Sequence, residues 1–196
     1  MGTSLDDAAL DAMFRTARTQ NRWLDQPVSD EQLQALYDLM RWGPTSANSF
    51  PVRIVFVTSP AAKERLKPLV LAGNQQKVMT APVTAILGYD TQFYDWLPRL
   101  FPHADARSWF LDKPEFAEAT AFRNSSLQGA YFIIAARALG LDCGPMSGFD
   151  NEAVDREFFP AGRVKSNFLC PLGHGDPAGL LERLPRPAFS EVCSIV

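Results

Sequence analysis

Apolar residues recur at three- and four-residue spacing in several stretches of the chain, and this spacing predicts helices. The clearest stretch follows Ser29, which forms a capping box with Gln32. Its apolar residues share one helical face up to the stop at Gly43-Pro44, and they are Leu33, Leu36, Tyr37 and Met40. The same reasoning predicts helices over residues 4–19, from 60 to a stop near 68, and over 74–80, 116–139 and 150–159.

Three shorter stretches are rich in β-branched and other apolar residues and predict strands, namely Arg53–Thr58, Val83–Tyr89 and Phe168–Leu172. The elements then run in the order of two helices, a strand, two helices, a strand, a long connection, a long helix, a short helix and a strand. Helices outnumber strands, which favours an α+β domain with a small sheet wrapped in helices. The length of 196 residues fits one domain spanning residues 1–196.

The connection over residues 91–115 differs from the rest of the chain. It is aromatic, punctuated by prolines and only weakly periodic. Connections of this length without clear structure are usually functional lids or partner-binding segments. We therefore expect a lid here. Its aromatic residues are Phe93, Tyr94, Trp96, Phe101, Trp109 and Phe110.

Composition and charge argue against several classes of function. A net charge of −3 argues against binding to nucleic acid, and no Lys/Arg cluster is suited to an anionic membrane. No stretch has the length of a membrane-spanning helix, and residues 1–7 do not resemble a secretory signal, so we expect a cytoplasmic protein. Two histidines and three dispersed cysteines give no metal spacing and no nucleophile elbow, so neither a metal site nor a hydrolytic triad is expected.

Anion binding finds more support, in five short segments. Three arginines at positions 15, 18 and 22 end the first predicted helix, where a solvated surface that compensates the helix dipole is the alternative. A polar loop over 45–49, either a ligand loop or a simple turn, follows the second helix. In a third segment, Asn74 and Lys77 place an amide and a cation on one helix face. The fourth is a loop over residues 145–148, whose backbone N–H groups could face a ligand, and the fifth holds Arg186 between two prolines.

These segments, in this order, resemble the nitroreductase family of flavoenzymes over nearly the whole chain. Arg18-Thr19-Gln20-Asn21-Arg22 is similar to the family's N-terminal Arg-x-Ser-x-Arg/Lys flavin motif. Residues 41–49 are similar to its helix-ending Ala-Pro-Ser-Ser-x-Asn element. Asn74-x-x-Lys77 resembles its mid-chain pair, Pro145–Asp150 its Gly-Phe-Asp loop, and Pro185-Arg186 its C-terminal phosphate-binding residue.

The resemblance implies an intertwined homodimer with a small, mostly antiparallel sheet in each subunit. It also implies FMN at the subunit interface and NADH or NADPH as electron donor, with the long helix from Phe116 forming much of the interface. One subunit would bind FMN through Arg18, Gln20, Arg22, Asn74, Lys77, Pro145, Met146, Ser147, Gly148 and Arg186. The other subunit would contribute Pro44, Thr45, Ser46 and Asn48.

The resemblance also implies roles for some of these groups. Arg18 and Arg186 suit the phosphate, because a guanidinium can bind it through two N–H groups. Arg22 or Lys77 would stabilise the negative charge that reduction places near N1 and O2 of the ring. A backbone N–H of the Ser147-Gly148 loop would face N5. No residue is assigned as a nucleophile, because the flavin carries the hydride chemistry.

Within the family, the chain is similar to the malonic semialdehyde reductase branch, which is associated with pyrimidine breakdown. Runs such as Trp42–Asn48, Asp105–Phe110 and Phe122–Ser126 carry this similarity. The implied reaction is ping-pong reduction of malonic semialdehyde to 3-hydroxypropionate, with Arg107 and Arg123 either binding the substrate carboxylate or serving as ordinary surface arginines. A broad-specificity nitro, quinone or enal reductase, a flavin-binding protein without turnover and a structural dimer stay open as alternatives.

Four positions depart from the family pattern, namely Gln20, Phe50, Val52 and Leu184. Serine, glutamine, tryptophan and lysine, respectively, are common there. The leucine at 184 predicts a phosphate site with fewer cations, for which Arg183 would compensate. FMN is therefore expected, but with a lower affinity than is usual in the family.

Overall fold

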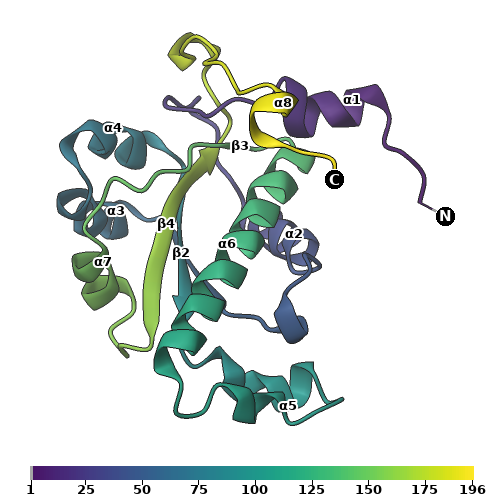
Figure 1. Cartoon of the computed structure of the whole chain (residues 1–196). Helices are drawn as coiled ribbons and strands as arrows, with labels where there is room; N and C mark the ends of the chain where they lie inside the picture. Colours follow the sequence, from purple (N-terminus) through teal and green to yellow (C-terminus); the bar gives the residue numbers. More distant parts are fainter. Residues whose placement is uncertain (1) are drawn as a thin grey trace.

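A four-stranded sheet forms the centre of the fold in the computed structural model, which describes residues 2–196 (Figure 1). The strands, in spatial order, are β1 (Val52–Val57), β2 (Val83–Asp90), β4 (Val164–Gly173) and β3 (Asp142–Cys143). All three neighbouring pairs are antiparallel, and the register between β2 and β4 shifts once, between Leu87 and Gly88. The predicted small antiparallel sheet is therefore confirmed.

Helices cover both faces of this sheet. The helices of the described chain are α1 (Asp7–Leu10), α2 (Asp30–Met40), α3 (Pro60–Leu66), α4 (Ala72–Thr80), α5 (Leu97–Leu100), α6 (Pro114–Ala138), α7 (Asn151–Phe158) and α8 (Phe189–Val192). Helices α2 and α6 pack on one face, whereas α3, α4 and α7 cover the other (Figure 1). Strand β2 is buried along its whole length because both of its faces are covered, which explains its continuous apolar sequence.

The ends of the main helices follow from local sequence. Ser29 caps α2, with its hydroxyl accepting from the Gln32 backbone N–H at 3.3 Å while the Gln32 side chain accepts from the Ser29 N–H at 2.9 Å. Helix α6 begins at Pro114, slightly before the predicted start, because proline suits the first turn of a helix. It ends before Gly140, whose φ of +75° is the left-handed conformation that glycine adopts without a steric penalty.

The predicted helix over residues 4–19 is wrong beyond Arg15. Helix α1 passes into a single π-helical stretch, Asp11–Arg15, and helical structure ends there. The chain then runs extended along the sheet edge, where the Gln20 N–H donates to the Cys143 carbonyl at 2.9 Å. This long-range hydrogen bond replaces helical ones, so the cationic motif over residues 18–22 lies on an extended segment.

Two strands also differ from the prediction. Strand β3 was not expected, because two residues carry no periodic signal and the strand exists only through pairing, as at Cys143 and Leu172. Strand β4 begins at Val164 rather than Phe168, because its first residues pair with the end of β2.

Residues 91–115 form ordered structure around an apolar cluster of their own. Two 3₁₀ turns, Phe93–Trp96 and Ala106–Trp109, flank α5. The buried residues of the cluster are Tyr89, Phe93, Leu97, Ala106, Phe110, Ala117 and Ala121. The expectation of a segment without clear structure is therefore wrong, because aromatic side chains pack on one another and on the first turns of α6 without any regular spacing. Its role as a lid stays a prediction.

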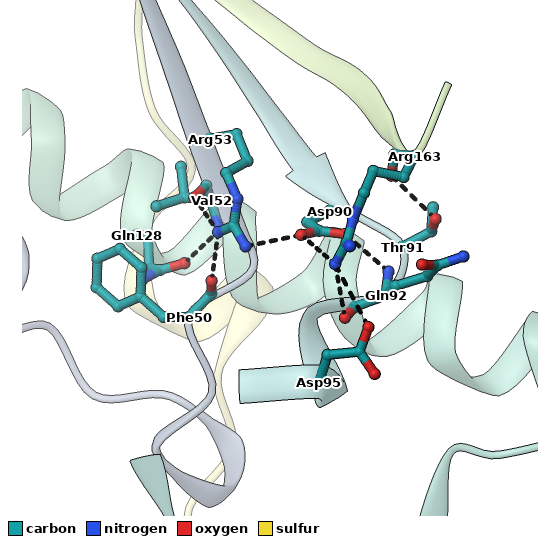
Figure 2. Close-up of polar contacts among 9 residues, drawn as sticks. All are labelled: Phe50, Val52, Arg53, Asp90, Thr91, Gln92, Asp95, Gln128 and Arg163. Carbon is teal, nitrogen blue, oxygen red and sulfur yellow. Dashed lines mark hydrogen bonds and ion pairs between the residues drawn. The ribbon is translucent and has the colours of Figure 1, made fainter. Parts of the chain in front are cut away.

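A buried carboxylate joins this segment to the sheet (Figure 2). Asp90, at the end of β2, accepts from Arg53 at 2.7 Å and from Arg163 at 2.8 and 2.9 Å. Arg163 also lies 3.8 Å from Asp95 in the first 3₁₀ turn, and the Arg53 guanidinium lies 4.7 Å from the centroid of the Trp96 ring. Strands β1, β2 and β4 and the aromatic segment therefore meet at one charge cluster.

Within residues 2–196, no helix is long and apolar enough to cross a membrane. The same residues contain no group of three or more metal-ligating side chains. Cys143, Cys170 and Cys193 are free thiols, and the first two are buried.

Candidate functional site

An arginine-rich cavity of about 940 Å³ lies between the first extended segment, the end of α6 and the C-terminal tail. Its four arginines are Arg18, Arg137, Arg183 and Arg186. Arg183 donates to the Ala17 carbonyl at 3.0 Å, and Arg18 donates to the Leu181 carbonyl, so backbone contacts hold the walls together. Glu182 is the one carboxylate among the described residues that line it. Guanidinium groups in this number favour an anion such as a phosphate.

The structure thus brings together Arg18 and Arg186, the two residues expected to bind a phosphate. Arg137 was missed from sequence, because a cation in the last turn of a helix is explained by the helix dipole alone. Its guanidinium donates to the Met13 carbonyl at 2.9 Å, which fixes it at this cavity. Leu184 lines the same cavity. Arg183, the residue expected to compensate for this leucine, lines it too, and Arg137 adds a guanidinium group that was not expected.

Gln20, two positions after Arg18, and Lys77 are both buried polar residues, and we call the region around them the nook. Both lie against Gly144, where a Cβ atom would overlap the Lys77 side chain and the Gln20 carbonyl. The Gln20 side chain lies against Gly175, where a Cβ atom would overlap it. Among residues 2–196, Gln20 Oε1 has no hydrogen-bond partner. Burial lowers the pKa of Lys77, and no carboxylate of the described chain offsets that effect. The nook therefore holds a buried acceptor without a partner and a buried cation that no carboxylate of the chain neutralises.

The loop over residues 145–148 is fixed on both sides. Met146 exchanges backbone hydrogen bonds of 2.8 and 3.0 Å with Leu169, as an isolated bridge to β4. The Asn74 side-chain amide donates to the Gly148 carbonyl at 3.1 Å, and a Cβ at Gly148 would overlap that amide. Pro145, Met146 and Ser147 line a cavity of about 510 Å³ against the middle of α6. Asn74 therefore positions this loop.

Arg22, the alternative to Lys77 for the negative charge on the flavin ring, lies at the surface. Its side chain is 64% exposed and lies 3.7 Å from Asp176. Its aliphatic stem packs against Gly179, where a Cβ would overlap it. Of the two cations proposed for the ring, Lys77 is therefore the one that the fold buries in the nook.

The Pro44–Asn48 loop is held by three hydrogen bonds. The Thr45 hydroxyl donates to the Ser49 carbonyl at 2.7 Å, and the Ser46 N–H donates to Asn124 Oδ1 of α6 at 2.8 Å. The Asn48 amide donates to the Leu100 carbonyl at 2.8 Å, so this side chain is engaged with α5. Pro44, Thr45 and Ser46 line a further cavity, of about 680 Å³.

The two sets of predicted FMN contacts lie at different places along α6. The loop over residues 44–48 contacts α6 at Asn124, whereas the arginine cavity includes Arg137 near the end of that helix. Thirteen residues of helix correspond to about 20 Å. In one chain, the Pro44–Asn48 loop therefore lies about 20 Å along the helix axis from the end of the arginine cavity at Arg137, while residues 145–147 face α6 between them.

The two arginines proposed as substrate contacts have different surroundings. Arg107 lies 3.1 Å from Asp95, and this ion pair neutralises the charge of Arg107. Arg123 lines the 680 Å³ cavity beside the Pro44–Asn48 loop. Of these two, Arg123 is therefore placed to meet a ligand.

Three comparisons place this fold among known proteins. A family model described as the nitroreductase family matches residues 15–174. A protein of Polynucleobacter asymbioticus that carries the name NADH dehydrogenase/NAD(P)H nitroreductase is 58% identical over 196 residues, which cover 100% of both chains. A nitroreductase structure from Bacillus subtilis has a TM-score of 0.85 and 22% identity, covering 97% of this chain and 100% of that chain. A nitroreductase–FMN complex from Exiguobacterium sibiricum has a TM-score of 0.83 and 18% identity, covering 100% and 99%.

The family assignment agrees with the motifs read from the sequence and with the fold. FMN and NAD(P)H, the cofactors expected from the motifs, are those that the family uses. The family model covers well over half of the sequence, and the Polynucleobacter relative matches it from end to end. The chain belongs to the nitroreductase family.

Proposed function

We propose that two copies of this chain form a homodimer with FMN at the interface, where NAD(P)H and a small acceptor react in turn. The nook beside the arginine cavity carries this proposal, because within residues 2–196 Gln20 Oε1 has no partner and the Lys77 cation meets no carboxylate. Buried polar groups are normally hydrogen-bonded, and buried charges are normally paired. Two exceptions next to a cationic cavity favour a ligand that brings its own donors and its own negative charge.

The residues present fit FMN. The four-arginine cavity suits its phosphate. Gln20 Oε1 would accept from a donor of the ribityl chain or ring, and Lys77 would stabilise negative charge on the ring. Gly144 lets the backbone come close to the Lys77 side chain, and Gly175 lets it come close to the Gln20 side chain, where a Cβ would overlap them. Bound FMN would supply the hydride chemistry, while these residues bind and orient it.

The dimer is proposed because one chain leaves the site incomplete. The Pro44–Asn48 loop of a second copy could face the nook, as in the two-fold arrangement common among homo-oligomers. Helix α6 offers an apolar surface for that contact. Its exposed large apolar side chains are Phe116, Phe122, Leu127 and Tyr131.

Mixing two defective variants tests this shared site. Lys77→Glu reverses the charge in the nook. Ser46→Trp places a bulky side chain on the Pro44–Asn48 loop, which a second copy would supply to the site. Each variant alone should be inactive, because both of its sites are damaged. A dimer containing one chain of each keeps one intact site, so random pairing of two-fold dimers should restore about one quarter of wild-type activity. Differently tagged chains show whether heterodimers have formed. If they have formed and the mixture is as inactive as each variant alone, the proposal is contradicted.

The flavin itself is tested by colour and by reduction. The purified protein should be yellow with flavin absorbance bands, and anaerobic NADH or NADPH should bleach those bands. A colourless protein that gains no flavin from added FMN would favour the structural dimer. A yellow protein that neither nicotinamide bleaches would favour a flavin-binding protein without turnover.

For the acceptor we propose malonic semialdehyde, reduced to 3-hydroxypropionate, which would place the protein in pyrimidine breakdown. Arg123 supports this, because it lines the cavity beside the Pro44–Asn48 loop and could bind the substrate carboxylate. The aromatic walls of the same cavity favour the second candidate, a broad-specificity nitro, quinone or enal reductase. Comparing kcat/KM for malonic semialdehyde with that for nitroaromatics decides between them. A cytoplasmic location stays a prediction, supported by the three free thiols.

A further inference from the structure

The 680 Å³ cavity beside the Pro44–Asn48 loop has walls from three parts of the chain. One face of the first half of α6 forms its floor, with Phe116, Thr120 and Leu127 at helical spacing. Trp109 and Phe110 of the aromatic segment form a second wall. The floor and this wall are joined, because the Phe110 and Phe116 rings stack with centroids 5.3 Å apart and planes 11° from parallel. The cavity can therefore take a flat, apolar body.

The charges lining this cavity are of one sign. Lys113 and Arg123 line it, and none of its described lining residues is acidic. On α6 the positions three and four residues from Arg123 are Ala119, Thr120, Ser126 and Leu127, so no helical neighbour supplies a carboxylate. No ion-pair partner of Arg123 occurs among residues 2–196. A negative group on a ligand would therefore meet a cation that is free to pair.

Arg123 lines the cavity next to the contact between α6 and the Pro44–Asn48 loop. Its neighbour Asn124 accepts the hydrogen bond from Ser46, in the loop proposed to face FMN of a second copy. Lys113, at the start of α6, is about 15 Å away along the helix axis. A single carboxylate near the Pro44–Asn48 loop would therefore lie closer to Arg123 than to Lys113.

We propose that Arg123 is a specificity-determining residue, which selects acceptors carrying a carboxylate on a flat, conjugated or aromatic body. This inference rests on the proposed function and extends it, because such acceptors are larger than malonic semialdehyde. The guanidinium binds the carboxylate through paired N–H groups, while the aromatic walls cover the apolar part. Uncharged acceptors of the same shape do not make the contact between carboxylate and guanidinium.

Matched acceptors test the proposal on the FMN-loaded protein. 4-Nitrobenzoate and 4-nitrobenzamide have nearly the same shape and differ in charge. Arg123→Gln should lower kcat/KM for 4-nitrobenzoate about tenfold, mainly through KM, which corresponds to about 1.4 kcal/mol. The same variant should change kcat/KM for 4-nitrobenzamide less than about twofold, and Arg123→Lys should recover part of the loss. Equal losses with both acceptors, or no loss with either, would overturn the proposal.

Two further variants separate a local contact from the general positive field. Arg99→Gln removes a cation that stacks on Trp96 outside the cavity, so it should behave as the wild type. Lys113→Gln removes a cation at the far end of the cavity and should cost no more than about threefold, the effect of a screened charge. A loss from Lys113→Gln equal to that from Arg123→Gln would overturn the assignment to Arg123.

A binding measurement keeps this test independent of turnover. Calorimetric titration of the oxidised, FMN-loaded protein with benzoate should give binding that benzamide lacks and that Arg123→Gln abolishes. If NAD(P)H fails to bleach the flavin, the proposed function is wrong, yet benzoate binding still reports on Arg123. If bleaching occurs while benzoate binds wild type and Arg123→Gln equally, this inference alone is overturned.

Discussion

Replacing Asp90 with asparagine is expected to lower the free energy of unfolding by about 3 kcal/mol, the low end of the cost of removing one partner from a buried ion pair. The substitution keeps the size of the side chain but removes the charge that Arg53 and Arg163 share (Figure 2). The Arg53 side chain is only 23% exposed. Burial lowers the pKa of Arg53, and Asp90 offsets part of this effect. Without Asp90, the buried charge of Arg53 is left uncompensated.

Urea denaturation measures this loss, and thermal unfolding should show a fall of roughly 6–12 °C for a domain of this size. Asp95→Asn is the matched control, since it makes the same change in the same cluster. The Asp95 side chain is 37% exposed and contacts Arg107 and Arg163 at 3.1 and 3.8 Å. Exposed pairs of this kind contribute at most about 1 kcal/mol. Equal losses from the two substitutions would contradict the argument from burial.

The parts of the fold that could be predicted are those with a local signal. The Ser29 capping box, the glycine after α6 and the apolar run of β2 each act within a few residues of sequence. Their geometry follows from hydrogen bonds or packing that neighbouring residues dictate. Most of the element order therefore follows from local patterns in the sequence, and the family resemblance adds the antiparallel pairing of the sheet.

The parts that could not be predicted depend on residues far apart in the chain. The Asp90 cluster joins residues 53, 90 and 163 at the ends of three strands, and none of them is unusual in its own surroundings. The extended path after Arg15 exists because its N–H groups find carbonyls on β3 and beyond β4. These long-range hydrogen bonds override the helical pattern in the sequence, because tertiary contacts outweigh the weak intrinsic helix propensity of the residues.

The candidate site shows the same division. Arg18 and Arg186 line one cavity although 168 positions separate them, and in the sequence only the family motifs link them. Arg137 belongs to the same cavity but carries no motif, so nothing in the sequence marks it. The compensation of Leu184 by Arg183 could be expected from sequence, whereas the presence of Arg137 beside them could not. Whether FMN binds less tightly than in other family members stays a prediction.

Replacing Lys77 with methionine should separate FMN binding from stability. Methionine fills a similar volume without the charge, so the variant is expected to bind FMN at least about tenfold more weakly, since a charged hydrogen bond is worth about 1.5–3 kcal/mol. The flavin that does bind should have a lower reduction potential, because the cation that favours negative charge on the ring is gone. Fluorescence titration with FMN and a dye-linked redox titration measure the two effects.

Lys63→Met is the control for this substitution. Burial also lowers the pKa of Lys63, but its ammonium donates to the Ala81 carbonyl at 2.5 Å and lines a different cavity, which includes Trp23 and Pro82. It should leave FMN affinity and the flavin potential unchanged. If both lysine variants bind FMN as the wild type does, Lys77 has no role in the site, and the proposed nook loses its main support.

The pH dependence of stability gives a second readout for Lys77. Its pKa in the folded chain lies below the ordinary lysine value of 10.5 because burial disfavours the charged form. Below the folded pKa, the wild-type protein carries the full cost of a buried ammonium, which Lys77→Met does not. Between the folded pKa and 10.5 the unfolded chain holds the proton that the folded chain has released, so wild-type stability rises with pH. The flavin-free methionine variant should therefore be more stable than the wild type at neutral pH, and its advantage should shrink as the pH approaches 10.5. An advantage that stays constant up to that pH would mean that packing, and not the buried charge, distinguishes the two proteins.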